Sequence, residues 1–213
     1  MRILYFFMGL LIFCTVGAPD VIAQKKQYPE PKEQLLPFVD RVLEVLVDKE
    51  LQGAEKKIER RQKIMDLAQE RFDFVEFSRL VLPDDQWKAL SGGERDHFVS
   101  LFKKLLEFAY INKLEGYGDQ KVVFVKQRFN KTRAVVHTKL IDEKSEEQVI
   151  YLMILRDNGW MIFDIVLQGT KDEKKVSILK NYRAQFKEII ANEQYSGLLK
   201  QLEERVADLE KKS

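Results

Sequence analysis

Cysteine and histidine are scarce in this sequence of 213 residues, which contains one cysteine, Cys14, and two histidines, His97 and His137. A single cysteine excludes a disulfide framework and every paired-cysteine zinc or redox site. Neither histidine has a partner at the spacing of a metal site or a catalytic triad. The motifs HExxH and GxSxG and the phosphate-binding GxxxxGK loop do not occur. The sequence therefore predicts no metal site, no cofactor and no common catalytic constellation.

An excess of charge of one sign is also missing. The 36 lysines and arginines oppose 34 aspartates and glutamates, which gives a net charge of +2. This balance provides no broad basic face, so no nucleic-acid partner is predicted. One residue in three is charged, yet 45% are hydrophobic, and this apolar content excludes a disordered chain. The length fits one domain or two small ones.

The longest apolar run lies at the N-terminus and is short. Arg2 precedes a nearly continuous apolar stretch from Ile3 to Val16, and small or branched residues lead to Ala23. Such a stretch is too short to span a membrane as a helix and is typical of a signal peptide, which we expect to be cleaved after Ala23. Lipidation of Cys14 is disfavoured by the bulky Phe13 before it, and an uncleaved anchor is the other alternative.

We accordingly divide the chain into a cleaved signal peptide at 1–23, a flexible leader at 24–34, and a single domain at 35–210. The leader is polar and holds two prolines. The remaining 190 residues contain no cysteine and can form a sizeable core without disulfides. The protein is expected to be exported.

Helical periodicity predicts four helices in the first half of the domain and two at its end. Pro37 can occupy the first turn of the first helix. Ser91 and Glu94 have the spacing of a capping box before the most amphipathic helix, which runs from Phe98 to Ala109. The expected ranges are 37–47, 54–71, 72–82, the helix that follows the capping box and ends at Glu115–Gly118, 176–191 and about 196–210.

Between these helices the apolar period changes from 3.6 to 2. We expect strands near 121–129, 132–142, 147–156 and 160–168, joined by short connections as an antiparallel meander. The Asp157–Gly159 segment is typical of a tight hairpin turn, because asparagine and glycine tolerate positive φ. Helices, then strands, then helices indicate the α+β class.

The third strand departs from the usual alternation of apolar and polar residues. Val149 to Leu155 are all apolar, so both faces of this strand must leave water. Two structures satisfy this requirement: an ordinary three-layer core, or a sheet whose one face lines a ligand cavity. Periodicity alone favours the packed core.

Two polar features remain open to a functional interpretation. Asp164 lies inside an apolar strand and could be a general base, a partner of an arginine or a group at a cavity mouth; we favour a structural role. Lys126, Arg128, Lys131 and Arg133 bracket the first hairpin. They could contact an anionic head group or an acidic partner, or they could form a solvated hairpin tip.

The C-terminal third resembles a known family. The segment Trp160–Gly169, followed by Val176–Phe186 with its Asn-Tyr-Arg-x-Gln-Phe motif, is similar to the MlaC family, also called toluene-tolerance or ABC-transporter auxiliary proteins. The resemblance extends over about residues 35–205. Three departures are a charged insertion at Thr170–Lys175, Gln168 in place of glutamate, and Pro83 in place of glycine.

The resemblance implies an NTF2-like fold, in which a curved antiparallel four-stranded meander is wrapped by N-terminal and C-terminal helices around an apolar cavity. It implies a periplasmic protein that is not an enzyme. Such a carrier binds phospholipid acyl chains and shuttles lipid between an outer-membrane lipoprotein complex and an inner-membrane ABC transporter complex. The alternatives are a carrier of hopanoid or another lipid, an NTF2-like enzyme with Asp164 or His137 as base, and an envelope module with a packed core.

Under this resemblance, acyl chains would lie among apolar residues of one helix and the sheet. Tyr182 and Phe186 would anchor the last helices to the sheet, and Arg183 would bind a partner or pair with Asp164. Lys126 and Arg128 are the other partner-binding candidates. The expected lipid-binding residues are Phe102, Leu106, Tyr110, Val123, Val125, Val135, Ile150, Leu152, Ile154, Phe163 and Ile165.

Overall fold

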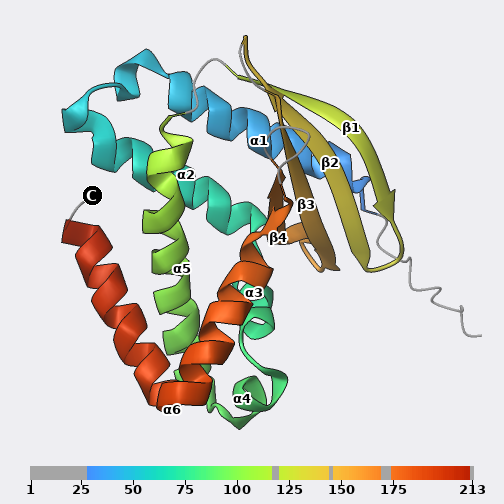
Figure 1. Ribbon diagram of the computed structural model, residues 1–213. Coiled ribbons are helices and arrows are strands. Elements are labelled where there is room, and N and C mark those ends of the chain that lie inside the picture. The colour runs from blue at the N-terminus through green and yellow to red at the C-terminus, as the bar shows by residue number, and fades with distance from the viewer. Residues whose placement is uncertain (1–27, 117–119, 144–145, 169–173, 212–213) are drawn as a thin grey trace, which may run out of the picture.

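The computed structural model describes residues 28–116, 120–143, 146–168 and 174–211. The expected signal peptide, residues 24–27 of the leader and residues 170–173 of the insertion lie outside these ranges. Figure 1 shows a twisted sheet on one side of the molecule and a layer of helices that packs against one of its faces.

The first two helices form an antiparallel pair against the sheet. Helix α1 runs over Pro31–Val47, followed by the short 3-10 helices η1 (Lys49–Leu51) and η2 (Ala54–Lys56) and by α2 (Lys57–Arg71). Pro31 occupies the first turn of α1, where its missing N–H costs nothing, and Glu30 and Glu33 form a capping box. The helix therefore begins inside the expected leader, and Pro37 lies within it rather than in its first turn.

Three further helices precede the sheet: α3 (Phe74–Val81), α4 (Asp84–Ala89) and α5 (Gly92–Leu114). The capping box before α5 is confirmed. The Ser91 N–H donates to Glu94 Oε2 at 2.8 Å, and the Glu94 N–H donates to Ser91 Oγ at 3.3 Å. Because the capping box sets the residue at which α5 begins, it also sets which side chains of α5 face the core.

The sheet is an antiparallel meander in the strand order β1-β2-β3-β4-β5, which confirms the predicted α+β topology. Its bounds are β1 Lys121–Phe129, β2 Arg133–Ile141, β3 Glu146–Arg156, β4 Gly159–Gln168 and β5 Val176–Ser177. The short β5 replaces the first turn of a predicted helix. Irregularities in register lie between Phe124 and Lys126 and between Leu152 and Met153.

The hairpin between β3 and β4 depends on one glycine. Gly159 has a φ of 113°. Among the described non-glycine residues only Gln194 has a positive φ, so Asn158 does not. Glycine alone, and not Asn158, therefore supplies the left-handed conformation of this turn. A side chain at position 159 would also collide with Gln34 of α1.

The last helix, α6, spans Ile178–Lys211 and reverses direction at Gln194, where φ is 63°. Figure 1 shows the two halves as an orange and a red arm that meet in a sharp bend and flank α5. Two terminal helices were predicted, and this bend separates them.

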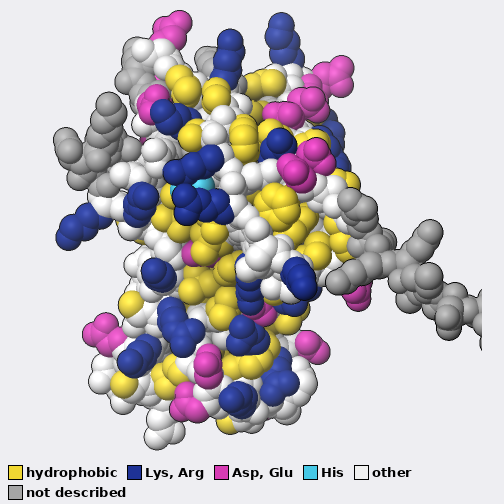
Figure 2. Space-filling view, turned by 90° about the vertical axis from the view of Figure 1, so that its right-hand side faces the viewer, with side chains coloured by type: hydrophobic (Ala, Val, Ile, Leu, Met, Phe, Trp, Pro, Cys, Tyr) yellow, Lys and Arg dark blue, Asp and Glu magenta, His cyan; other side chains and the backbone are white. Residues whose placement is uncertain are grey.

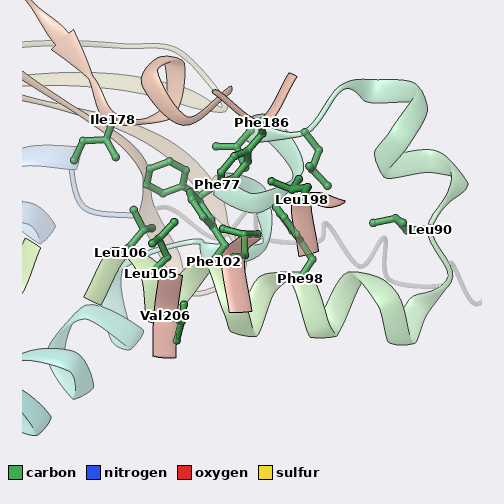
Figure 3. Close-up of a cluster of buried hydrophobic side chains, with 13 residues drawn as sticks. Phe77, Leu90, Phe98, Phe102, Leu105, Leu106, Ile178, Phe186, Leu198 and Val206 are labelled. Carbon is green, nitrogen blue, oxygen red and sulfur yellow. The ribbon is translucent and has the colours of Figure 1, made fainter. Parts of the chain in front are cut away.

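Three buried hydrophobic clusters stabilise the molecule. The aromatic cluster joins α3, α5 and α6 (Figure 3), the sheet cluster joins α1 to the inner sheet face, and the small cluster joins α1, α2 and α5. The aromatic cluster contains Phe77, Val81, Leu82, Leu90, Phe98, Phe102, Leu105, Leu106, Ile178, Phe186, Leu198, Leu202 and Val206. The sheet cluster contains Leu35, Phe38, Val39, Leu67, Ala134, Val136, Tyr151, Met153, Trp160 and Ile162; the small cluster contains Leu46, Ile64 and Ile111.

Tyr182 and Phe186 attach α6 to α5 rather than to the sheet, contrary to expectation. Their ring centroids lie 5.3 and 5.6 Å from that of Phe102, in edge-on geometry. Edge-to-face pairs of this kind stabilise aromatic cores beyond simple burial. Phe102 is fully buried at the centre of these contacts.

Candidate functional site

A cavity of about 240 Å³ lies where the inner sheet face meets the helices. Seven elements supply most of its wall: α1, α2, α5 and the inner faces of β1–β4, with additional aromatic residues from the α2–α3 junction and α3. The lining residues are Phe38, Val39, Val42, Leu43, Leu46, Ile64, Met65, Ala68, Phe72, Phe74, Phe77, Leu106, Glu107, Tyr110, Ile111, Leu114, Val122, Thr138, Leu140, Val149, Tyr151, Ile165, Leu167 and Ile178.

This wall is almost entirely apolar, which distinguishes the cavity from larger hollows elsewhere. A hollow of about 890 Å³ between α5 and the two arms of α6 carries several charged side chains, among them Lys200, Glu204 and Arg205. Another of about 710 Å³ is bordered by five residues around the β3–β4 turn. Of these three hollows in the described part of the chain, the apolar cavity has the walls suited to a ligand without polar groups.

The polar groups of the cavity wall are few and mostly engaged. The Thr138 hydroxyl donates to the Val149 carbonyl at 3.0 Å. Burial raises the pKa of Tyr151 to about 12, so this phenol stays neutral. Burial likewise raises the pKa of Glu107, the one carboxyl group in the wall. No nucleophile faces a base in the wall, which suits it to holding apolar chains.

The structure brings three of the eleven expected lipid-binding residues into the cavity wall: Leu106, Tyr110 and Ile165. Phe102 lies instead in the centre of the aromatic cluster. The remaining seven residues are strand residues outside the cavity wall: Val123, Val125, Val135, Ile150, Leu152, Ile154 and Phe163.

The cause of this correction is strand parity. Side chains alternate between the two faces of a sheet, and Val122 and Val149 line the cavity, so Val123 and Ile150 point to the opposite face. Val123 and Val125 are 44% and 43% exposed. Phe163 lies in the β4 irregularity, between the paired residues Ile162 and Asp164, and the Arg133 guanidinium lies 4.7 Å from the centre of its ring.

Sequence reasoning missed the contribution of the first two helices. Phe38, Val39 and Leu46 of α1, with Ile64 and Met65 of α2, form the side of the cavity that faces the sheet. Their helical apolar stripes were visible in the sequence. The sequence alone does not assign these stripes to a cavity, because a stripe that covers a core and one that covers a cavity are identical in pattern.

Asp164 is a structural capping group and does not line the cavity. Its side chain is 2% exposed and accepts from the Ser177 hydroxyl at 2.6 Å and from the Leu179 N–H at 2.9 Å. Burial raises its pKa, and the two hydrogen bonds oppose that rise. Asp164 thus satisfies donors at the start of α6, in agreement with the structural interpretation. Arg183 does not pair with it: its guanidinium donates to the Leu80 carbonyl and lies 3.8 Å from Asp84.

The other candidates lie on the surface. His97 Nε2 is 3.3 Å from Glu203, and both side chains are half exposed. His137 lies on the outer sheet face, where burial and the nearby cations Lys126, Lys175 and Arg128 lower its pKa. Figure 2 looks onto this side of the molecule and shows basic side chains gathered around a histidine.

A compact ionic cluster borders the cavity between α2 and α5. Arg61 donates to both carboxylate oxygens of Glu115, at 3.2 and 3.0 Å, and Arg60 donates to the same carboxylate at 2.8 Å. The three side chains are 10–14% exposed. Arg60 also donates to the Leu51 carbonyl of η1.

Within the described ranges, no group of three or more histidine, cysteine or acidic side chains could hold a metal ion. Among the described helices, none combines the length and apolar character needed to cross a bilayer.

Fold and cavity together define the class: an α+β protein whose antiparallel meander and helices enclose an apolar chamber. The model of the MlaC protein family matches residues 37–204, which is more than half of the chain. The chain therefore belongs to the MlaC family, as its C-terminal motif predicted.

A solved structure supports the same conclusion for the fold. A phospholipid-binding protein from Ralstonia solanacearum, determined in complex with a phospholipid, superposes with a TM-score of 0.72. The likeness covers 85% of this chain and 99% of that chain, at 22% sequence identity. No curated protein sequence matches this chain.

Proposed function

We propose that this protein is a periplasmic phospholipid carrier that holds acyl chains in the apolar cavity. The observation that supports this function best is the cavity itself, whose wall of 24 residues contains a single ionisable carboxyl group. Membership of the MlaC family and the phospholipid in the similar Ralstonia solanacearum structure point in the same direction. Leu106, Tyr110 and Ile165 are the tail contacts common to the sequence prediction and the cavity wall.

The energetics of the cavity suit transfer rather than permanent storage. Each methylene group buried in an apolar wall contributes about 0.8 kcal/mol, which is close to what it gains in a bilayer. Exchange between protein and membrane is then nearly balanced. A carrier needs this balance and no reaction chemistry, so we do not assign an enzymatic activity.

Loading requires the cavity walls to separate. The cavity volume of about 240 Å³ is below the ~300–1,000 Å³ of pockets for drug-sized ligands, and a two-tailed lipid is larger still. The cavity is lined by members of all three hydrophobic clusters. We infer that it widens along the boundaries between these clusters, where the fewest packed contacts must be broken.

We further propose that the carrier passes lipid between an outer-membrane lipoprotein complex and an inner-membrane ABC transporter complex. The basic outer face of the sheet is the candidate contact surface. Lys126 and Arg128 are exposed there and form no ion pair with any described residue. Arg183, the third candidate, is half exposed but already held by Leu80 and Asp84. Residues 1–23 would act as the export signal for the domain at 35–210.

Lipid extraction from purified protein followed by mass spectrometry tests the carrier function. We expect close to one phospholipid per protein molecule, and uptake of lipid from vesicles by delipidated protein. Protein that is empty after purification and takes up no lipid from vesicles would refute the proposal. A packed-core module would give this result.

A further inference from the structure

The ionic cluster of Arg60, Arg61 and Glu115 has the composition of an anion site. Two guanidinium groups point three N–H donors at one carboxylate, all at 3.2 Å or less. Arginine forks match carboxylate and phosphate oxygens equally well in geometry. Arg60 and Arg61 carry two positive charges and Glu115 carries one negative charge, so the cluster has a net charge of +1.

Its position is the second observation. Arg61 lies one helical turn before Ile64 and Met65, and Glu115 directly follows Leu114; these three apolar residues line the cavity. Arg61 is only 8% exposed and lies within electrostatic range of Glu107, the carboxyl group in the cavity wall. The cluster is not itself part of the cavity wall, but through Arg61 and Glu115 it adjoins that wall where α2 meets the end of α5.

The local electrostatics permit a second anion. Burial raises the pKa of Glu107, which limits the negative charge that this residue places beside Arg61. Burial also opposes ionisation of Glu115, but hydrogen bonds from Arg61 and Arg60 outweigh it and lower its pKa. Glu115 is thus the resident anion of the cluster.

We propose that Arg60 and Arg61 form a phosphate site for the polar end of the bound lipid, and that the phosphodiester replaces Glu115 on these arginines during loading. The proposal rests on the carrier function above. It adds a role for Glu115, which occupies the arginines in the empty protein and neutralises part of their buried charge. Tails in the apolar chamber and a phosphate on the adjacent arginines would then hold one molecule at two points.

The test compares two lipids with the same tails. Delipidated protein is incubated with neutral phosphatidylcholine vesicles doped equally with dioleoyl phosphatidylglycerol and dioleoylglycerol, and the bound amounts of the two dopants are measured by mass spectrometry. We expect the wild type to retain phosphatidylglycerol over dioleoylglycerol about ten-fold or more, as charge-assisted hydrogen bonds predict. The double substitution Arg60→Gln, Arg61→Gln should reduce this ratio toward one without lowering the dioleoylglycerol retained.

Two further variants keep the result interpretable if the double variant folds poorly. Glu115→Gln removes the competing charge, and we expect it to raise the ratio. Arg41→Gln is the matched control, because Arg41 also pairs with a glutamate between α1 and α2, at 2.9 Å, but this pair is half exposed whereas the Arg60, Arg61 and Glu115 side chains are 10–14% exposed; it should leave the ratio unchanged.

The remaining outcomes separate the two proposals. An unchanged ratio in Glu115→Gln and in a folded double variant refutes the phosphate site and leaves the carrier function standing. Retention of no lipid by any protein, with the phosphatidylcholine of the vesicles measured as well, refutes both. Inorganic phosphate at 10-fold excess over lipid should not displace phosphatidylglycerol; displacement would assign the arginines to free phosphate and overturn the proposal.

Discussion

Filling the cavity from the sheet side should abolish lipid uptake without unfolding the protein. Val122 lines the cavity near the start of β1, and Val122→Trp would place an indole in the chamber. If the indole replaces about 100 Å² of acyl-chain contact, the lost burial at ~25 cal/mol/Å² is about 2.5 kcal/mol, or roughly 60-fold weaker binding. The ring enters an existing cavity, so the free energy of unfolding should change by less than about 2 kcal/mol.

The next residue provides the control. Val123 belongs to the same strand but points to the opposite face and is 44% exposed. Val123→Trp should therefore bind a fluorescent phospholipid as the wild type does in a binding titration. Thermal unfolding of each variant is measured alongside. Equal loss of binding in both variants would show a general effect of the bulky residue in β1. Unchanged binding by Val122→Trp would show that acyl chains do not occupy this chamber.

Two further predictions concern stability. Burial alone would raise the pKa of Glu76, but hydrogen bonds from Arg79 and Arg133 lower it to about 2. This carboxylate should contribute on the order of 3 kcal/mol above pH 4.5, lost as pH falls toward 2, and urea unfolding of Glu76→Gln should lack this acid dependence; an identical pH profile would contradict it. Asp164→Ala leaves the donors of Ser177 and Leu179 unpaired and should lower the free energy of unfolding by about 2–4 kcal/mol, measured in urea, while the folded protein still binds lipid. Lost lipid binding at unchanged stability would instead favour a direct role for Asp164 in the site.

The order of elements was predictable because local signals set it. The capping box at Ser91, the apolar stripe of α5 and the turn before Gly159 each depend on neighbours in sequence. The start of α1 was predicted wrongly, because Pro31 and Pro37 both suit a first helical turn; the capping box of Glu30 and Glu33 places the start at Pro31. The short β5 likewise depends on pairing with β4, which no local pattern reveals.

The cavity was harder to predict than the fold. Consecutive apolar residues such as Val122–Val125 provide no alternation, so the sequence cannot assign a strand face. The irregularity after Phe124 then shifts the pairing by one residue and changes which side chains face inward. The ionic cluster was also invisible, because Arg61 and Glu115 are 54 residues apart and meet only when α2 packs beside α5.

The separation of the core into three clusters has a consequence for how the protein unfolds. Ile165 packs against both the aromatic and the sheet cluster, and Val42, Leu43 and Val45 pack against both the sheet and the small cluster. Few side chains join the clusters, and the cavity lies where they meet. An acyl chain in this position would contact all three hydrophobic clusters and pack against each of them. Bound lipid would thus make unfolding more cooperative. In protein that has delivered its lipid, the three clusters would be less strongly coupled, and their separation for reloading would be easier.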